Sequence, residues 1–236
     1  ITGVAATFNG WEFLAAVDTI TGEDGRVSYI VRSARGTSDV SADARAILSP
    51  GKCDHCGIAK SNRVYTYLVR NVESGEMMQV GKSCLRDFIG GEVRPVFFSE
   101  DEIMAGYGAG SGGRSFSVAT VVGYASMVAE LEGEFVPSSA HWQTTTSDIV
   151  SLILYPTPRE KADRDIYMQN LTEKFGAGFD VASRGRDIIA ELRDGLVADN
   201  NYADNLLAAL SAEYVDTKHF RLVVSAIGAL YRMRDG

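Results

Sequence analysis

The three cysteines of the chain are the residues whose type and spacing indicate chemistry. Cys53 and Cys56 form a CxxC turn followed directly by Gly57, and Cys84 comes later, after the sequence GKS. A CxxCG turn directs two thiolates toward one point, and thiolates are preferred ligands of zinc. Three cysteines in a chain of this length do not build a disulfide framework. The sequence therefore predicts a structural Zn²⁺ bound by Cys53, Cys56 and Cys84 in a reducing, cytoplasmic compartment.

A tetrahedral zinc site needs a fourth ligand, and several residues are candidates. Asp87 lies three residues after Cys84, on the same face of the first turn of a predicted helix, and is the ligand we favour. The alternatives are His55, His141, His219 and a water molecule. His55 lies between Cys53 and Cys56, so its side chain is expected to point away from the ion that they share. If no metal binds, Asp87 would instead satisfy the N-terminus of the helix.

Two predicted strands and a short helix must position these ligands. Val64–Arg70 and Glu76–Val80 are strand-like and are joined by a turn at 73–75, and the helix Cys84–Ile89 ends at two glycines. The CxxCG turn at 53–57, which has the form of a zinc knuckle, is followed by a hairpin and then by a helix with ligands in its first turn. This is the order of a treble-clef zinc site. Upstream, Gly10–Val17 and Arg26–Arg32 predict another hairpin.

Helical patterns dominate the chain after a predicted boundary near residue 95. Apolar residues recur with a helical period, and capping residues precede several of the segments. The sequence thus predicts an α+β chain with a β-rich, treble-clef-like zinc-knuckle domain at 1–95 and an all-helical domain at 96–236. The expected helices of the second part are Ser117–Leu131, Ser147–Leu154, 158–175, Ser183–Asp194, Asn200–Leu210 and Thr217–Arg232, the last two as a pair.

Two further patterns match ligand-binding motifs. The segment 108–113 matches GxGxxG, but a helix rather than a strand is expected before it, so we interpret it as a linker. The last helix places Lys218, His219 and Arg221 in its first turn, as a recognition helix would. Its many apolar residues instead favour a buried structural hairpin. No HExxH motif, catalytic triad or carboxylate pair stands out, so we expect structural zinc and a non-enzymatic protein.

Charge is distributed unevenly along the chain. The net charge of −8 argues against general nucleic-acid binding, but residues 50–95 carry seven basic and five acidic side chains. We therefore predict that the zinc unit binds nucleic acid, and the alternative is a protein partner for the acidic helical half. No apolar run reaches the roughly 20 residues of a membrane span, and no signal peptide is recognised. The predicted phosphate-binding residues are Lys60, Arg63, Arg70, Lys82 and Arg86.

Several segments resemble a group of zinc-knuckle proteins encoded by bacteriophages and other mobile elements of bacteria. The segments that carry the resemblance are GWEF at 10–13, CDHCG at 53–57 and QVGKSCLRDF at 79–88, and more weakly NNYADNL at 200–206 and KHFRLVVSAIGALY at 218–231. The resemblance implies a setting in a bacterial host cell, with a role in phage or plasmid replication, expression or counter-defence. It also implies a fixed role for Asp87, because an Asp recurs at this position in the group.

Overall fold

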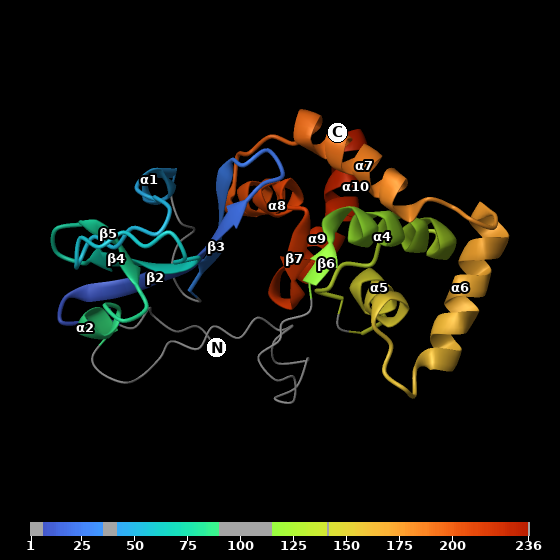
Figure 1. Ribbon diagram of the computed structural model, residues 1–236, viewed down its shortest axis with the longest axis horizontal. Helices are drawn as coiled ribbons and strands as arrows, with labels where there is room; N and C mark the ends of the chain where they lie inside the picture. Colours follow the sequence, from blue (N-terminus) through green and yellow to red (C-terminus); the bar gives the residue numbers. More distant parts are fainter. Residues whose placement is uncertain (1–6, 35–41, 90–114, 141, 236) are drawn as a thin grey trace. The chain divides into compact units, whose positions relative to one another are not determined.

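The chain folds into two compact units, one built on a sheet and one built mostly of helices (Figure 1). The computed structural model describes residues 7–34, 42–89, 115–140 and 142–235. The first unit contains the described part of residues 1–98 together with Asp199–Ser211, and the second contains the described part of 99–198 and of 212–236. The predicted α+β class is confirmed. The predicted boundary near residue 95 and the segment 108–113 lie outside the described residues.

The first unit is organised around an antiparallel sheet of five strands. The long strand β2 (Trp11–Thr21) pairs with β4 (Tyr65–Asn71) along one edge. Along its other edge it pairs with β1 (Thr7–Phe8) and then with β3 (Val27–Ser33). β5 (Met77–Gly81) follows β4 as a hairpin partner. The two predicted hairpins therefore lie in one sheet, joined through the β2–β4 pair.

Each face of this sheet carries its own apolar cluster. Side chains alternate along a strand, so that Leu68 and Val69 point to opposite faces, and both are fully buried. Leu68 packs with Val17, Val31 and residues of and after α1 (Ala42–Ala46). Val69 belongs to the other cluster, whose buried members are Phe13, Cys53, Val69, Val80, Leu85 and Phe88. Cys53 and the residues around α2 (Arg86–Ile89) thus pack on one face of the sheet.

A helix from far along the chain completes the first unit. α8 (Asn201–Ser211) packs against β3, and the buried Asn205 makes two hydrogen bonds to the backbone of Val31. The Val31 N–H donates to Asn205 Oδ1 at 2.7 Å, and Asn205 Nδ2 donates to the Val31 carbonyl at 2.8 Å. Arg45 also donates to Asn205 Oδ1 and pairs with Asp204 at 3.2 Å. An amide side chain therefore takes the place of a neighbouring strand at this edge of β3.

The second unit is built around the buried helix α4 (Val118–Glu132). α7 (Val181–Gly195) packs closely against α4, which is possible because Gly185 has no side chain: a Cβ there would lie 1.8 Å from the Ala119 carbonyl oxygen. A Cβ at Gly123 would likewise lie 2.0 Å from the Val181 carbonyl oxygen. The other helices that the structure describes in this unit are α5 (Thr146–Leu154), α6 (Lys161–Phe175), α9 (Phe220–Val224) and α10 (Ala226–Asp235).

The second unit also contains two short strands that the sequence did not predict. β6 (Ser115–Ser117) and β7 (Tyr214–Asp216) form an antiparallel pair that precedes α4. Each strand has three residues, which is too short to show an alternating pattern. β7 follows α8 directly, so the predicted final helix pair is split: α8 belongs to the first unit, whereas α9 and α10 belong to the second.

Candidate metal centre

The knuckle loop, residues 51–60, presents Cys53 and Cys56 from a tight turn. The Gly57 N–H donates to the Cys53 carbonyl at 2.9 Å, and Gly57 has φ +69°, a conformation that glycine adopts without strain. Gly51 closes the base of the loop with φ +65°, and a Cβ there would lie 2.1 Å from the Lys60 carbonyl oxygen. The local sequence therefore fixes the direction of the two thiols. Cys53 is 1% exposed, whereas Cys56 lies at the surface.

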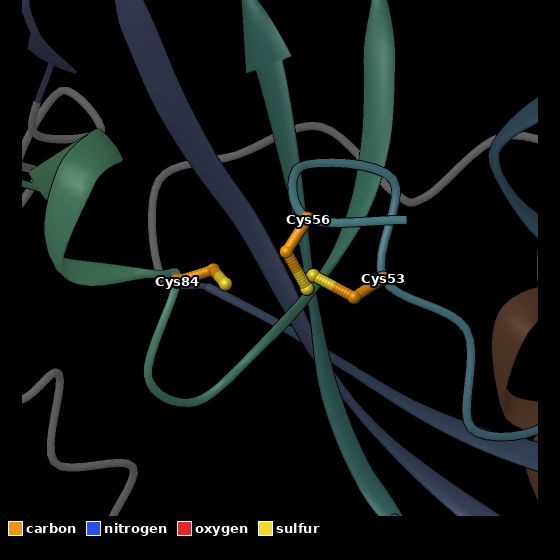
Figure 2. A group of neighbouring side chains, drawn as sticks. All are labelled: Cys53, Cys56 and Cys84. Carbon is orange, nitrogen blue, oxygen red and sulfur yellow. The ribbon is translucent and has the colours of Figure 1, made fainter. Parts of the chain in front are cut away.

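Cys84 is delivered by the turn between β5 and α2. The N–H groups of Cys84 and Leu85 both donate to the Gly81 carbonyl at 3.0 Å, so the chain reverses immediately after the strand. Leu85 is buried in the same cluster as Cys53. This anchoring directs the Cys84 side chain back toward the knuckle, and all three cysteine side chains point toward one another (Figure 2).

The three sulfur atoms lie within 4.8 Å of one another, and none is in a disulfide. Within the described residues, this group of neighbouring potential ligand atoms contains only the three thiols and no carboxylate or imidazole. Thiolates at this spacing suit a single metal ion that accepts sulfur ligands at about 2.3 Å, as zinc does. The residues present thus fit the predicted metal, and the convergence of the CxxC turn on Cys84 is as the spacing predicted.

The electrostatics of the cluster favour a bound cation. Burial raises the pKa of the Cys53 thiol, but hydrogen bonds from the Gly81 N–H and from Cys56 outweigh it and lower the pKa to about 7. Burial, together with the two neighbouring thiols, raises the pKa of Cys84 to about 11. Cys53 therefore ionises more readily than a free thiol, and its negative charge disfavours ionisation of Cys84. A divalent cation among the sulfurs would offset this repulsion between thiolates.

Backbone and side-chain hydrogen bonds fasten the knuckle to the outer edge of β5. Asp54 and Gln79 exchange two bonds of 2.8 Å: the Asp54 N–H donates to the Gln79 carbonyl, and the Gln79 N–H donates to Asp54 Oδ2. The Gly81 N–H donates to Cys53 Sγ at 3.3 Å. The knuckle therefore occupies a strand edge that would otherwise offer its N–H and C=O groups to another chain.

The side chain of Gln79 anchors Ser49, in the segment that leads into the knuckle, and this role was not identified from the sequence. It is fully buried, accepts from the Ser49 N–H at 2.8 Å, and donates to the Ser49 carbonyl at 2.9 Å and to Thr66 Oγ1 at 3.0 Å. A glutamine inside a strand-like apolar segment, MMQVG, is the sequence signal that could have indicated such a role.

Asp87 and His55 face each other beside the cysteine cluster. His55 Nδ1 lies 3.7 Å from Asp87 Oδ2, and the two side chains are 40% and 61% exposed. The Asp87 carboxylate would have to turn toward the sulfurs to bind the same ion, so its role as fourth ligand stays a prediction. Of the alternatives, His219 is buried in the second unit, and His141 lies outside the described residues.

The five predicted phosphate-binding residues fall into two groups. Arg63 donates to the carbonyls of Gly51 at 2.6 Å and Ile58 at 2.8 Å, and Arg70 pairs with Glu12 at 2.6 Å. These two guanidinium groups are therefore engaged within the unit. The other three of the five, Lys60, Lys82 and Arg86, lie exposed on the knuckle and on the turn around Cys84, and Arg86 donates from Nε to the Ser83 carbonyl at 3.2 Å.

The first turn of the last helical segment does not present a recognition surface. His219 is 2% exposed, and Lys218 Nζ lies 3.3 Å from Asp216 Oδ2 with only 11% of its side chain exposed. The segment begins as a short 3₁₀ turn, η1 (Thr217–His219), and is interrupted at Ser225 between α9 and α10. This agrees with the structural role that its apolar composition favoured.

Membrane insertion through a helix finds no support in the described part of the chain, where every helix is too short or too polar to cross a bilayer. Comparison of the chain with protein-family models, with curated proteins and with solved structures finds no match. The three converging thiols and the exposed side chains around them are therefore the basis for assigning a function.

Proposed function

We propose that this chain is a non-enzymatic zinc protein of a bacteriophage or another mobile element, and that its zinc-knuckle unit binds nucleic acid. The observation that carries the proposal is the convergence of Cys53, Cys56 and Cys84 within 4.8 Å. With Asp87 as the fourth ligand, the ion would be held only by the protein's own side chains. Its role would then be structural, since it would contribute binding free energy directly to folding. The order of knuckle, β4–β5 hairpin and α2 supports a treble-clef-like arrangement.

Zinc would also position the side chains that meet phosphates. Lys60 lies on the knuckle loop, and Lys82 and Arg86 flank Cys84 on the turn that leads into α2. Because the ion would join the knuckle to this turn, it would fix the spacing between the two groups of cations. Lysine and arginine contacts to phosphates position a protein on nucleic acid without reading its sequence. Arg63 and Arg70 are left out of the proposed contact surface, since both are only partly exposed and are engaged within the unit, whereas Arg86 is exposed.

Binding to single- and double-stranded DNA and to RNA, measured by fluorescence anisotropy at several salt concentrations, tests this proposal. With two or three phosphate contacts on duplex DNA, we expect the logarithm of the binding constant to fall with the logarithm of salt concentration at a slope of roughly −2 to −3. The double variant Lys82→Glu and Arg86→Glu should abolish the salt-sensitive component. Arg159→Glu with Lys161→Glu is the matched control, because it makes the same charge change on exposed residues of the second unit.

A protein-interaction module with purely structural zinc is the second candidate. It is favoured by the net charge of −8 and by Trp142, which is 81% exposed in the link between α4 and α5. Exposed tryptophans are enriched among residues that anchor protein interfaces. Zinc content with no nucleic-acid binding at any salt concentration would overturn the first candidate and leave the second. Binding that survives the Lys82 and Arg86 changes but is lost in the control variant would place the contact surface on the second unit.

A further inference from the structure

His55 and Asp87 come from the two segments that also carry the zinc ligands. His55 lies inside the CxxC turn, and Asp87 lies on α2, three residues after Cys84. Their facing atoms, Nδ1 and Oδ2, are 3.7 Å apart. Since Gly57 and Gly81 fix the two backbone turns, the separation of this pair is set by the same elements that set the separation of the thiols.

The imidazole of His55 is packed against aromatic rings. Its ring centroid lies 5.1 Å from that of Phe88 in an edge-on arrangement, and Phe88 meets Trp11 in the same manner at 4.9 Å. Phe88 is only 6% exposed and belongs to the apolar cluster that contains Cys53. One side of the imidazole is therefore fixed by the core of the unit, while its Nδ1 faces the Asp87 carboxylate.

We propose that His55 is a positioning residue of the metal centre: it donates a hydrogen bond from Nδ1 to one Asp87 carboxylate oxygen and so holds the other oxygen ready as the fourth ligand. This inference rests on the proposed zinc site. Carboxylate–histidine pairs beside metal ions commonly fix a ligand in this way, with one member on the ion and the other in the surrounding shell. The 3.7 Å separation is in the range of an ion pair, and it would close by roughly 0.7 Å to reach an ordinary hydrogen bond as Asp87 turns to the ion.

The role assigned to His55 explains two features of the site together. A histidine between the two cysteines of a CxxC turn is poorly placed to be a ligand, and its ring is held instead against Phe88. An exposed aspartate at the start of a four-residue helix has little to keep it directed toward an ion. A hydrogen bond from His55 would restrict the rotamers of Asp87 and lower the entropic cost of recruiting it.

Zinc affinity of the full chain, measured by competition with a chromophoric chelator, tests the inference. His55→Phe keeps a ring against Phe88 but removes the N–H, whereas His55→Asn keeps an N–H donor near the position of Nδ1. We expect His55→Phe to weaken zinc binding about 10- to 100-fold, and His55→Asn to stay within a few-fold of the unchanged protein. The visible absorption of the cobalt(II)-substituted protein should shift in His55→Phe as it does in Asp87→Asn. A role limited to packing would not produce that shift.

The combination of His55→Phe with Asp87→Asn decides whether His55 acts through Asp87. If it does, the double variant should bind zinc no more weakly than Asp87→Asn alone. Additive losses, equal losses in His55→Phe and His55→Asn, or unchanged affinity in His55→Phe would each overturn the inference while leaving the metal site in place. Failure of the unchanged protein to bind zinc or cobalt would overturn the metal site itself, and the inference with it.

Discussion

Single polar residues decide how the knuckle is held on the sheet. Gln79 uses both ends of its side-chain amide on Ser49 and Thr66, and its backbone pairs with Asp54. Buried polar groups are costly when their partners are removed, because the remaining donors and acceptors are left without hydrogen bonds. The stability of the metal-binding loop therefore depends on a residue that does not touch the metal.

We expect Gln79→Leu to destabilise the first unit by roughly 2–4 kcal/mol, because it strips hydrogen bonds from Ser49 and Thr66 at nearly constant volume. Denaturant unfolding followed by Trp11 fluorescence, in a Trp142→Phe background, would measure this. Gln169→Leu, at an exposed position of α6, is the matched control and should change stability by less than about 0.5 kcal/mol. Equal effects of the two substitutions would contradict the role assigned to Gln79.

Removal of the metal should destabilise the first unit as well. At a free zinc concentration of about 100 times the dissociation constant, binding would stabilise the folded unit by roughly 3 kcal/mol. Unfolding in the same Trp142→Phe background, with and without a chelator, gives this difference. Cys84→Ser leaves only two thiols, so its stability should not respond to zinc. A chelator that leaves the stability of the unchanged protein as it was would rule out a stabilising ion.

At the scale of single residues, the sequence predicted what depends on local spacing. The CxxC turn and the position of Cys84 after a hairpin were enough to predict that the three thiols converge. The engagement of Arg63 by the Gly51 and Ile58 carbonyls, and of Arg70 by Glu12, depends on tertiary contacts. Basic residues on a predicted hairpin therefore gave no indication of which cations remain at the surface.

At the scale of elements, the packing of α4 on α7 depends on two glycines. Helices approach at this distance only where a Cβ is missing, and the positions concerned are Gly123 and Gly185. Both lie inside helices, where alanine is intrinsically favoured over glycine by about 1 kcal/mol. Their presence against this preference indicates that the close approach of backbones, rather than helix formation, determines the residue.

We expect Gly185→Ala to destabilise the second unit by about 1–3 kcal/mol, because the new methyl group would meet the Ala119 carbonyl at 1.8 Å and force the helices apart. Gly195→Ala on the same helix is the control. Its methyl group would meet only the flexible end of the Met233 side chain, so the cost should be small. Thermal unfolding followed by far-UV circular dichroism compares the two. A Gly185→Ala protein as stable as the unchanged one would show that α4 and α7 can separate freely.

The elements themselves were largely predictable, for reasons that also explain the exceptions. Apolar periodicity and turn residues predicted the four longer strands of the sheet and the helices after residue 117. β6 and β7 have three residues each, too few for a pattern. The attachment of α8 to β3 rests on Asn205, a contact across 174 residues that no local pattern encodes.

At the scale of the whole molecule, the first unit is discontinuous in sequence. Its sheet comes from the N-terminal part of the chain, and α8 is contributed after most of the second unit. Asn205 provides the hydrogen bonds that the edge of β3 would otherwise lack. An unprotected strand edge is a common site of association between chains.

A fragment of residues 1–98 should therefore associate with itself and bind zinc less tightly than the full chain. Fusion of residues 199–211 to this fragment through a flexible linker should restore a monomer. Light scattering coupled to size-exclusion chromatography, with zinc analysis of the monomer peak, measures both properties. The same fusion carrying Asn205→Leu is the control and should behave like the fragment. A monomeric, fully stable fragment of residues 1–98 would show that α8 is dispensable.

The late position of α8 also sets an order of events during synthesis. When the last strand of the sheet leaves the ribosome, more than a hundred residues remain to be translated before Asn205 emerges. Throughout that interval the nascent chain carries the metal-binding loop at the β5 edge of its sheet and an uncovered β3 edge at the other. Newly made chains on neighbouring ribosomes would be able to pair through that edge. The rate of translation after β5, or a chaperone bound to that edge, would then influence the yield of folded protein.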